Sequence, residues 1–194
     1  VIKHWELKRY LNTDPKQPQP IQLVPADEKG VSLIPPLTVE VLDVGLQERL
    51  AKSLYAVSGK DLTLSEGRPA GEIGFSYTDP ETGAQVAKRL TFHHGSYLVD
   101  LAVEISGVSS STTLSLGTNF GIHQWEEGFV GFIGPATHIA DKLDKATPEK
   151  EDLRPGSMKW AAMQDKYFLA AAIPADAVTH IGVVRKEGER LVSV

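Results

Sequence analysis

The stretch QVAKRLTFHHGSYLVDLAVEI, residues 85–105, decides the fold class. In its second half Asp100 and Glu104 share one parity, and apolar residues take the other. Those apolar residues are Tyr97, Val99, Leu101, Val103 and Ile105. Neighbouring residues of a strand point to opposite faces, so this alternation predicts a half-buried strand.

The first half of the stretch predicts the partner of that strand. Val86, Leu90 and Phe92 share one parity, and polar residues lie between them. Gly95-Ser96 supplies a tight turn between the two halves. The stretch therefore predicts an antiparallel hairpin.

A third strand precedes the hairpin. Residues 73–78 end at Asp79-Pro80-Glu81-Thr82-Gly83, in which Pro presets φ and Gly accepts a positive φ. This turn predicts that 73–78 pairs with 85–92. Three sequential antiparallel strands follow from the pattern.

Short strand patterns also fill most of the remaining chain, whereas helical patterns are scarce. Further strand candidates are Trp5–Leu7, Ile21–Val24, Leu54–Val57, Thr112–Leu116, Met158–Met163, Phe168–Ile173, His180–Val184 and Leu191–Val194. The helical candidates are Leu46–Leu54 and a single turn at Ala140–Lys145, and loops are predicted at 14–20, 35–36, 66–69 and 141–155. Such spacing predicts a mainly β sandwich or barrel with little helix.

Composition predicts one domain over residues 1–194. A chain of 194 residues with 41% hydrophobic residues can bury one sizeable core. The sequence contains no run of about 18 apolar residues, which is the length that a membrane-spanning helix needs. Apolar, β-prone text stands at both ends, so we interpret the chain as a piece of a longer protein.

Charge and cysteine content exclude several function classes. The formal charge is −5, from 20 basic and 25 acidic residues, and neither sign forms a block. This distribution gives no footprint for nucleic acid. The chain has 0 cysteines, which excludes thiolate nucleophiles, thiolate metal sites and disulfides.

Histidines give no metal-binding pattern. His93 and His94 are adjacent, so on a strand they point to opposite faces and do not grip one ion together. The other histidines are isolated in sequence: His4, His123, His138 and His180. We predict no metal residues.

Catalytic and cofactor motifs are also missing from the sequence. It has no Gly-x-Ser-x-Gly elbow and no phosphate-binding loop. Glu126-Glu127 beside Trp125 is interpreted as a solvated loop, and Trp160, Tyr167 and Phe168 as core. We predict no catalytic residue and no cofactor, and the binding residues stay unassigned.

The segment PGSMKWAAMQDKYFLAAAIP, residues 155–174, resembles the periplasmic part of the YidC membrane protein insertases. In that family a Gly precedes a Trp-containing strand, and Asp-Lys-Tyr-Phe and a small-residue run closing on Ile-Pro follow it. Other segments resemble the family in the same order, namely 1–11, 89–99, and 132–135 followed by 141–143. Residues 37–59 depart from the family pattern.

The resemblance implies a periplasmic domain of a Gram-negative inner-membrane insertase. The implied fold is a large twisted antiparallel β-sandwich, a supersandwich similar to galactose mutarotase-like folds. The resemblance further implies that the chain is a piece of the longer protein without the family's first strands, its C-terminal part and its membrane helices. The implied domain is a soluble monomer and not an enzyme, because insertion needs no covalent step.

The implied partners are the Sec translocon with its accessory subunits and nascent inner-membrane proteins. A scaffold or docking role for them predicts an exposed groove or sheet edge. Two alternatives stay open. One is a mutarotase-like sugar-processing domain in which His94 or His123 meets Glu104, and the other is a carbohydrate binder that stacks sugars on Trp125 or Trp160.

Overall fold

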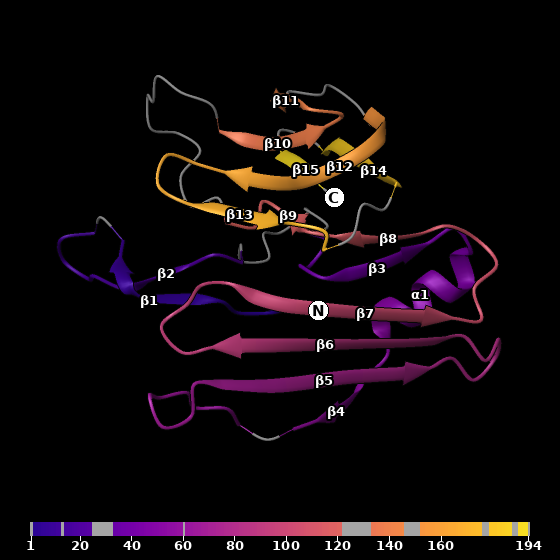
Figure 1. Ribbon diagram of the computed structural model, residues 1–194, viewed down its shortest axis with the longest axis horizontal. Helices are drawn as coiled ribbons and strands as arrows, with labels where there is room; N and C mark the ends of the chain where they lie inside the picture. The colour runs from indigo at the N-terminus through magenta and orange to yellow at the C-terminus, as the bar shows by residue number, and fades with distance from the viewer. Residues whose placement is uncertain are drawn as a thin grey trace. The chain divides into compact units, whose positions relative to one another are not determined.

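The computed structural model describes residues 2–12, 14–24, 33–59, 61–121, 133–145, 152–175, 179–187 and 190–193 (Figure 1). The chain divides into two compact units. Unit 1 comprises Val1–Thr38 and Thr113–Val194, and unit 2 comprises Val39–Thr112. β3 (Thr38–Val41) and β8 (Thr112–Ser115) lie where the chain passes from one unit to the other.

Unit 2 is built on a four-stranded antiparallel sheet of order β4-β5-β6-β7 (Figure 1). Its strands are β4 (Ala56–Ser58), β5 (Ala70–Thr78), β6 (Gln85–His93) and β7 (Val99–Ser106). Ile73 lies opposite Leu90, and Leu90 lies opposite Leu101. The three sequential antiparallel strands predicted from the sequence are confirmed.

The two faces of this sheet differ in polarity. In β7 Val99, Leu101, Val103 and Ile105 are half-buried, and the residues between them are exposed. We call the side of the sheet that carries these residues the apolar face. The registers add these residues of β5 and β6 to it: Ile73, Phe75, Tyr77, Val86, Lys88, Leu90 and Phe92. Glu72, Arg89 and Glu104 lie on the opposite, polar face.

Helix α1 (Val44–Lys52) confirms the helical pattern predicted near residues 46–54. The carboxylate of Asp43 caps the helix by accepting a hydrogen bond from the backbone N–H of Leu46 at 2.7 Å. Leu46 and Leu50 are buried. Leu54 lies beyond the end of the helix and is 96% exposed.

Unit 1 contains a seven-stranded sheet with the order β11-β10-β12-β14-β15-β9, in which β13 also pairs with β12. Its strands are β9 (Gly117–Thr118), β10 (Gly134–Ile139), β11 (Lys142–Lys145), β12 (Asp152–Gln164), β13 (Leu169–Ala172), β14 (Thr179–Glu187) and β15 (Arg190–Ser193). The long strand β12 connects the two parts of the sheet, because it pairs with different strands along its length. Its residues 152–157 pair with β14, and residues 158–164 pair with β10.

The small residues of the Trp-containing segment form the buried centre of that sheet. Ala161, Ala162 and Met163 are each at most 2% exposed, as is usual for a strand covered on both faces. Ala162 lies opposite Ala136 of β10 on one side and Ala171 of β13 on the other.

Unit 1 also contains a two-stranded ribbon of β1 (Glu6–Leu11) and β2 (Pro20–Gln22). Leu7 and Ile21 lie opposite each other and are buried. The ribbon is anchored within unit 1 by Trp5, whose ring meets that of Phe120 edge to face at 5.9 Å. The other residues of β1 are exposed.

Asp165 shapes the turn between β12 and β13. Its carboxylate accepts hydrogen bonds from the backbone N–H groups of Tyr167 at 2.7 Å and Phe168 at 2.6 Å. Its own backbone N–H donates to the carbonyl of Phe168 at 2.9 Å. Asp165 is only 7% exposed, so its bonds are shielded from water.

The structure corrects the sequence predictions at the hairpin of β10 and β11. The helical turn predicted at Ala140–Lys145 is wrong, because Ile139 pairs with Lys142 across a two-residue turn. Ala140 and Asp141 have φ of +47° and +63°, as tight hairpin turns require. The loop predicted over 141–155 is likewise wrong where it overlaps β11 and β12.

The mainly β, antiparallel fold with little helix is confirmed. Each of the further strand candidates from the sequence overlaps a strand of the structure. The sequence did not predict β3, β9, β10 and β11. No helix among the described residues is long and apolar enough to cross a membrane. The single domain over 1–194 stays a prediction.

We expect Asp165→Ala to lower the free energy of unfolding by about 1–3 kcal/mol, because two partly buried backbone N–H groups lose their acceptor. Asp14→Ala is the matched control, since Asp14 accepts from the backbone N–H of Lys16 in an exposed turn. Its loss should cost under about 1 kcal/mol, because water replaces the carboxylate. Urea unfolding followed by circular dichroism measures both, and equal losses would contradict this role of Asp165.

Candidate functional site

A groove of about 640 Å³ opens on the apolar face of unit 2. Apolar side chains supply most of its lining: Val57, Leu62, Leu64, Ile73, Phe75 and Phe92. Gly59 and Asp61 complete it. We call this site the unit 2 groove, and it is the kind of feature that the docking hypothesis predicts.

The groove exists because loop residues, and not a full strand, lie over one end of the sheet. β4 pairs with only three residues of β5, from Gly74 to Ser76. Beyond β4 the side chain of Leu62 packs against the backbone of Gly71, where even a Cβ atom would clash. Gly71 therefore leaves room for this close approach, and a larger residue would require the end of the Leu62 side chain to shift.

The apolar side chains of the groove are incompletely covered. Val57 is 61% exposed, and Ile73, Phe75 and Phe92 are half-buried. Incompletely covered apolar side chains at a concave site are typical of surfaces that bind another molecule. The arrangement offers hydrophobic contact and places no cluster of reactive groups.

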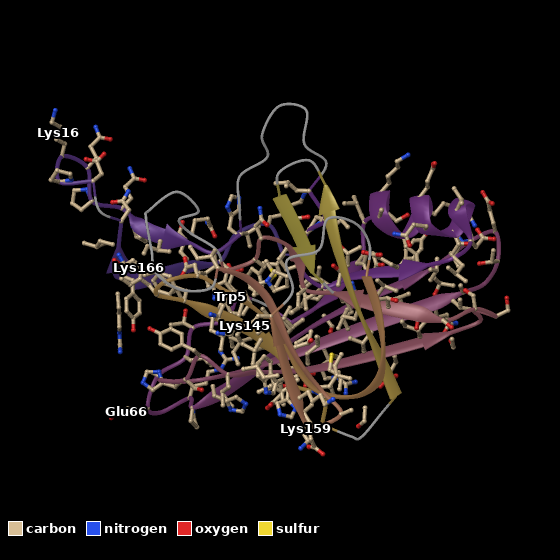
Figure 2. The ribbon with its side chains drawn as sticks, turned by 90° about the horizontal axis from the view of Figure 1, so that it is seen from above. Trp5, Lys16, Glu66, Lys145, Lys159 and Lys166 are labelled. Carbon is tan, nitrogen blue, oxygen red and sulfur yellow. The ribbon has the colours of Figure 1, made fainter. Side chains whose placement is uncertain are left out.

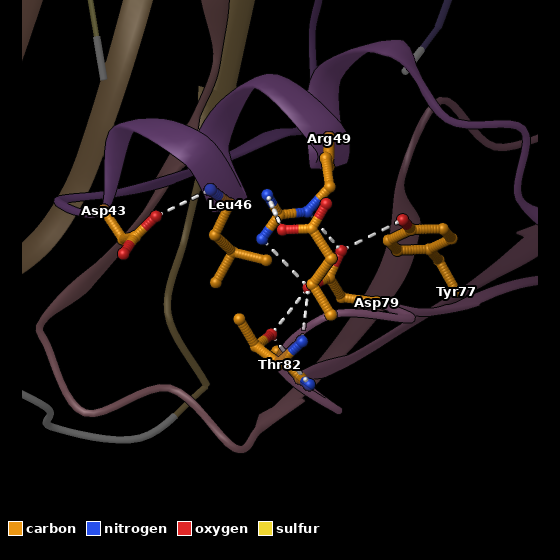
Figure 3. Close-up of polar contacts among 8 residues, drawn as sticks. Asp43, Leu46, Arg49, Tyr77, Asp79 and Thr82 are labelled. Carbon is orange, nitrogen blue, oxygen red and sulfur yellow. Dashed lines mark hydrogen bonds and ion pairs between the residues drawn. The ribbon is translucent and has the colours of Figure 1, made fainter.

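A polar cluster fixes helix α1 to the turn between β5 and β6 (Figure 3). The Asp79 carboxylate is fully buried and accepts hydrogen bonds from Arg49 Nε at 2.7 Å and Nη2 at 3.1 Å. Thr82 donates to it from the backbone N–H at 2.9 Å and from Oγ1 at 2.7 Å. The Tyr77 hydroxyl donates at 3.3 Å.

This cluster holds Asp79 in its charged form. The hydrogen bonds from Arg49 are the largest cause that lowers the pKa of Asp79 far below its ordinary value, and Thr82 adds to the effect. The same pairing raises the pKa of Arg49. Removal of one partner from a buried ion pair strongly destabilises the fold, because the remaining charge is left uncompensated.

Lys88 lies at the middle of the apolar face, opposite Phe75 and Val103. The residue is 5% exposed, and burial lowers the pKa of its amine to about 8. Its Nζ lies 5.4 Å from the ring centroid of Tyr55, which compensates part of the lost hydration. Burial in turn raises the pKa of Tyr55.

The adjacent histidines 93 and 94 do not form a joint site. His93 Nε2 lies 2.8 Å from the carboxylate of Asp100 on the neighbouring strand, where both side chains are partly exposed. His94 is exposed in the turn after β6. The interpretation of the pair as structural stays a prediction.

His94 and Glu104 lie too far apart for shared acid-base chemistry. Glu104 pairs with Ala87, which is seven residues from His94 along the chain. Seven residues of strand span about 23 Å. The structure therefore does not favour a sugar-processing site built on His94 and Glu104.

The remaining chemistry-bearing residues are dispersed or lie outside the described residues. His4 Nδ1 lies 3.4 Å from Gln22 Nε2, and the His138 ring stacks at an angle on Trp160 at 6.0 Å. Among described residues, no group of three or more His, Asp or Glu could hold a metal ion. The following residues, or their side chains, are not described: His123, Trp125, Glu126, Glu127 and His180.

The core assignment of the aromatic cluster near residue 160 requires correction. Trp160 and Phe168 are half-buried, whereas Tyr167 is 58% exposed. The Asp165 turn projects Tyr167 outward, so the cluster is not a uniform core. The unit 2 groove was also missed, because its aromatic residues carry the same strand alternation as core residues do.

We expect Asp79→Asn to lower the melting temperature by several degrees, because Arg49 loses its charged partner inside the protein. Glu81→Gln is the control, since Glu81 also pairs with Arg49 but is 67% exposed. Because the pKa of Asp79 is lowered, the native chain should have its full stability advantage over Asp79→Asn above about pH 5. That advantage should shrink as the pH falls further, and thermal unfolding between pH 3 and 7 tests it.

We expect Lys88→Met to stabilise the chain at pH 7 by up to about 3 kcal/mol, because methionine avoids the cost of burying a charge. The unfolded chain binds this proton more tightly, so native stability should rise with pH from about 8 toward 10.5. The variant lacks that rise. Thermal unfolding from pH 7 to 9.5 measures the difference, with the exposed Lys52→Met as control, and parallel curves for native chain and Lys88→Met would contradict it.

Comparison with known proteins identifies the family of the chain. The sequence model for the family described as YidC periplasmic domain matches residues 1–192. Membrane protein insertase YidC of Nitratidesulfovibrio vulgaris strain Miyazaki F is 25% identical over 188 residues, which cover 91% of this chain and 32% of that protein. The insertase of Syntrophus aciditrophicus is 25% identical over 206 residues, covering 100% of this chain and 36% of that protein.

A third relative, the insertase YidC of Nitratidesulfovibrio vulgaris strain DP4, is 30% identical over 162 residues, which cover 77% of this chain and 30% of that protein. The chain spans about a third of the length of these curated relatives. The resemblance carried by residues 155–174 is thereby confirmed. The match extends over nearly all residues of both units, and the chain belongs to the YidC periplasmic domain family.

Proposed function

We propose that this chain is a non-catalytic docking domain of a membrane protein insertase. The observation that carries the proposal is the unit 2 groove, whose lining is mostly apolar. Its occupant is an extended apolar segment of a protein that the insertase handles or assembles with. In this function the domain makes and breaks no covalent bond.

The chemistry of the groove suits such an occupant. Insertion moves apolar segments from water into lipid, and a temporary apolar surface lowers the cost of exposing them. Val57, Phe75 and Phe92 offer that surface. Asp61 at the rim disfavours an acidic occupant.

The edge of the sheet adds a second means of recognition. β4 is the terminal strand of the sheet and contains three residues, Ala56–Ser58. An extended segment laid beside β4 would pair with its free edge and place alternate side chains over Val57. Backbone pairing supplies affinity there, and the groove supplies preference for apolar side chains.

The family assignment supports the setting of this role. We infer that the chain works in the periplasm as part of an inner-membrane protein, with both units forming one monomeric domain. The proposed partners are translocon subunits of the Sec type and nascent inner-membrane proteins. Sugar processing and sugar binding have no comparable site among the described residues.

The test is a titration of the purified chain with two probes: the periplasmic domains of Sec translocon subunits, and a fluorescent extended peptide from an inner-membrane protein. We expect Val57→Asp to weaken binding of at least one probe tenfold or more, because the segment would bury a charge. Val57→Thr keeps the branched shape and should weaken it less.

Val44→Asp is the matched control, because Val44 is 74% exposed at the start of α1 and away from the groove lining. It should bind as the native chain does. Circular dichroism verifies that all variants keep the fold. Absence of binding by the native chain to both probes, or equal losses at Val57 and Val44, would remove the proposal.

A further inference from the structure

Unit 1 carries a separate exposed apolar surface, which we call the aromatic patch. Its residues are Tyr10, Leu11, Tyr167, Phe168 and Leu169. The exposed fractions of Tyr10, Leu11, Tyr167 and Leu169 are 45%, 54%, 58% and 60%. Leu11 and Leu169 directly follow Tyr10 and Phe168 in the chain, and four large apolar side chains exposed this far in two contacting segments exceed what scattered surface residues explain.

Ring contacts join the two elements that form the patch. The ring of Tyr10 on β1 meets Phe168 edge to face at 5.6 Å, and Phe168 meets Tyr167 at 6.4 Å. Asp165 fixes the backbone of the β12–β13 turn from the buried side. The patch is therefore held by the fold and does not depend on a loose loop.

Exposed basic side chains lie in the same segments of the chain as the patch. Lys8 and Arg9 are exposed on β1, and Lys16 is exposed in the loop that follows it. Lys166 is exposed beside Tyr167, and its Nζ lies 5.0 Å from that ring centroid. Both Lys16 and Lys166 lie at the left of the view in Figure 2.

The local charge is opposite to that of the whole chain. Residues 3–20 contain four basic residues, Lys3, Lys8, Arg9 and Lys16, and two acidic residues, Glu6 and Asp14, so their net charge is +2. The complete chain has a net charge of −5. The segment that contributes Tyr10 and Leu11 to the patch is therefore net positive.

We propose that the aromatic patch binds the surface of an anionic phospholipid bilayer. Tyrosine rings beside lysine and arginine are the combination that membrane interfaces favour, because the rings enter the headgroup region and the cations pair with lipid phosphates. The cores of protein interfaces are in contrast depleted in lysine. This proposal rests on the proposed function in one respect, namely that the chain works close to a membrane.

Flotation of the 194-residue chain with vesicles tests the proposal. Vesicles of phosphatidylcholine alone are compared with vesicles that contain about one third phosphatidylglycerol, at about 0.1 M and 0.5 M salt. We expect the chain to float with the anionic vesicles at the lower salt. Binding should fall at the higher salt and be weak on neutral vesicles.

A charge variant tests the basic residues. Arg9→Gln, Lys16→Gln and Lys166→Gln together should weaken binding on the order of a hundredfold, since each basic residue near an anionic surface contributes about fivefold. The control combines Lys52→Gln, Arg68→Gln and Arg89→Gln, which removes the same charge from exposed positions of unit 2. It should keep most of the binding.

An apolar variant tests the patch itself. Leu11→Ser, Tyr167→Ser and Leu169→Ser together should abolish flotation. The control removes the same residue types from unit 2, with Leu54→Ser, Tyr97→Ser and Leu98→Ser, at positions that are 96%, 62% and 71% exposed. Circular dichroism verifies the fold of both variants.

Three results would overturn the proposal: no flotation of the native chain with anionic vesicles, equal flotation with neutral vesicles, or equal losses for the patch and control variants. Val57→Asp separates this proposal from the docking role, because it changes the groove and should leave flotation unchanged. Intact groove binding without flotation overturns the bilayer contact alone. Flotation without groove binding overturns the docking role alone.

Discussion

The alternation of apolar and polar residues along β5, β6 and β7 is the constraint on which unit 2 depends. Because side chains of a strand alternate between faces, a slip of one residue in the register would expose the apolar face completely. The register that places Ile73, Leu90 and Leu101 in one row avoids this. It also carries Lys88 onto the apolar face, where burial lowers the pKa of its amine to about 8.

The cation on the apolar face and the ion pair at the turn are two different solutions for buried charge. Asp79 is satisfied by Arg49, Thr82 and Tyr77, so its charge is retained and ties α1 to the sheet. Lys88 relies in part on the ring of Tyr55, and its pKa falls because burial disfavours its charge. The first arrangement resists acid until its carboxylate is protonated, whereas the second costs stability below its lowered pKa.

Periodicity predicted the elements of unit 2 well, because each of its long strands keeps one face apolar. It failed at the β10–β11 hairpin, where Ala140 and Asp141 adopt positive φ without the Gly or Asn that marks such turns. The resemblance in residues 155–174 identified the family, yet the outward position of Tyr167 depends on the hydrogen bonds of Asp165. The groove could not be predicted, since alternation shows which face is apolar and not which part of it remains uncovered.

Exposed apolar surface is costly in water, and the unit 2 groove and the aromatic patch differ in the charge beside them. The unit 2 groove has Asp61 at its rim and a lining without exposed lysine among the residues that the structure describes. The aromatic patch has Lys8, Arg9, Lys16 and Lys166 in the same segments of the chain. An anionic surface would be attracted by the second and gain little from the first. An extended apolar segment has the opposite preference, because it needs a concave lining more than charge. The two surfaces therefore suit two different occupants, and a domain that contacts lipid through one unit keeps the groove of the other chemically distinct for a protein segment.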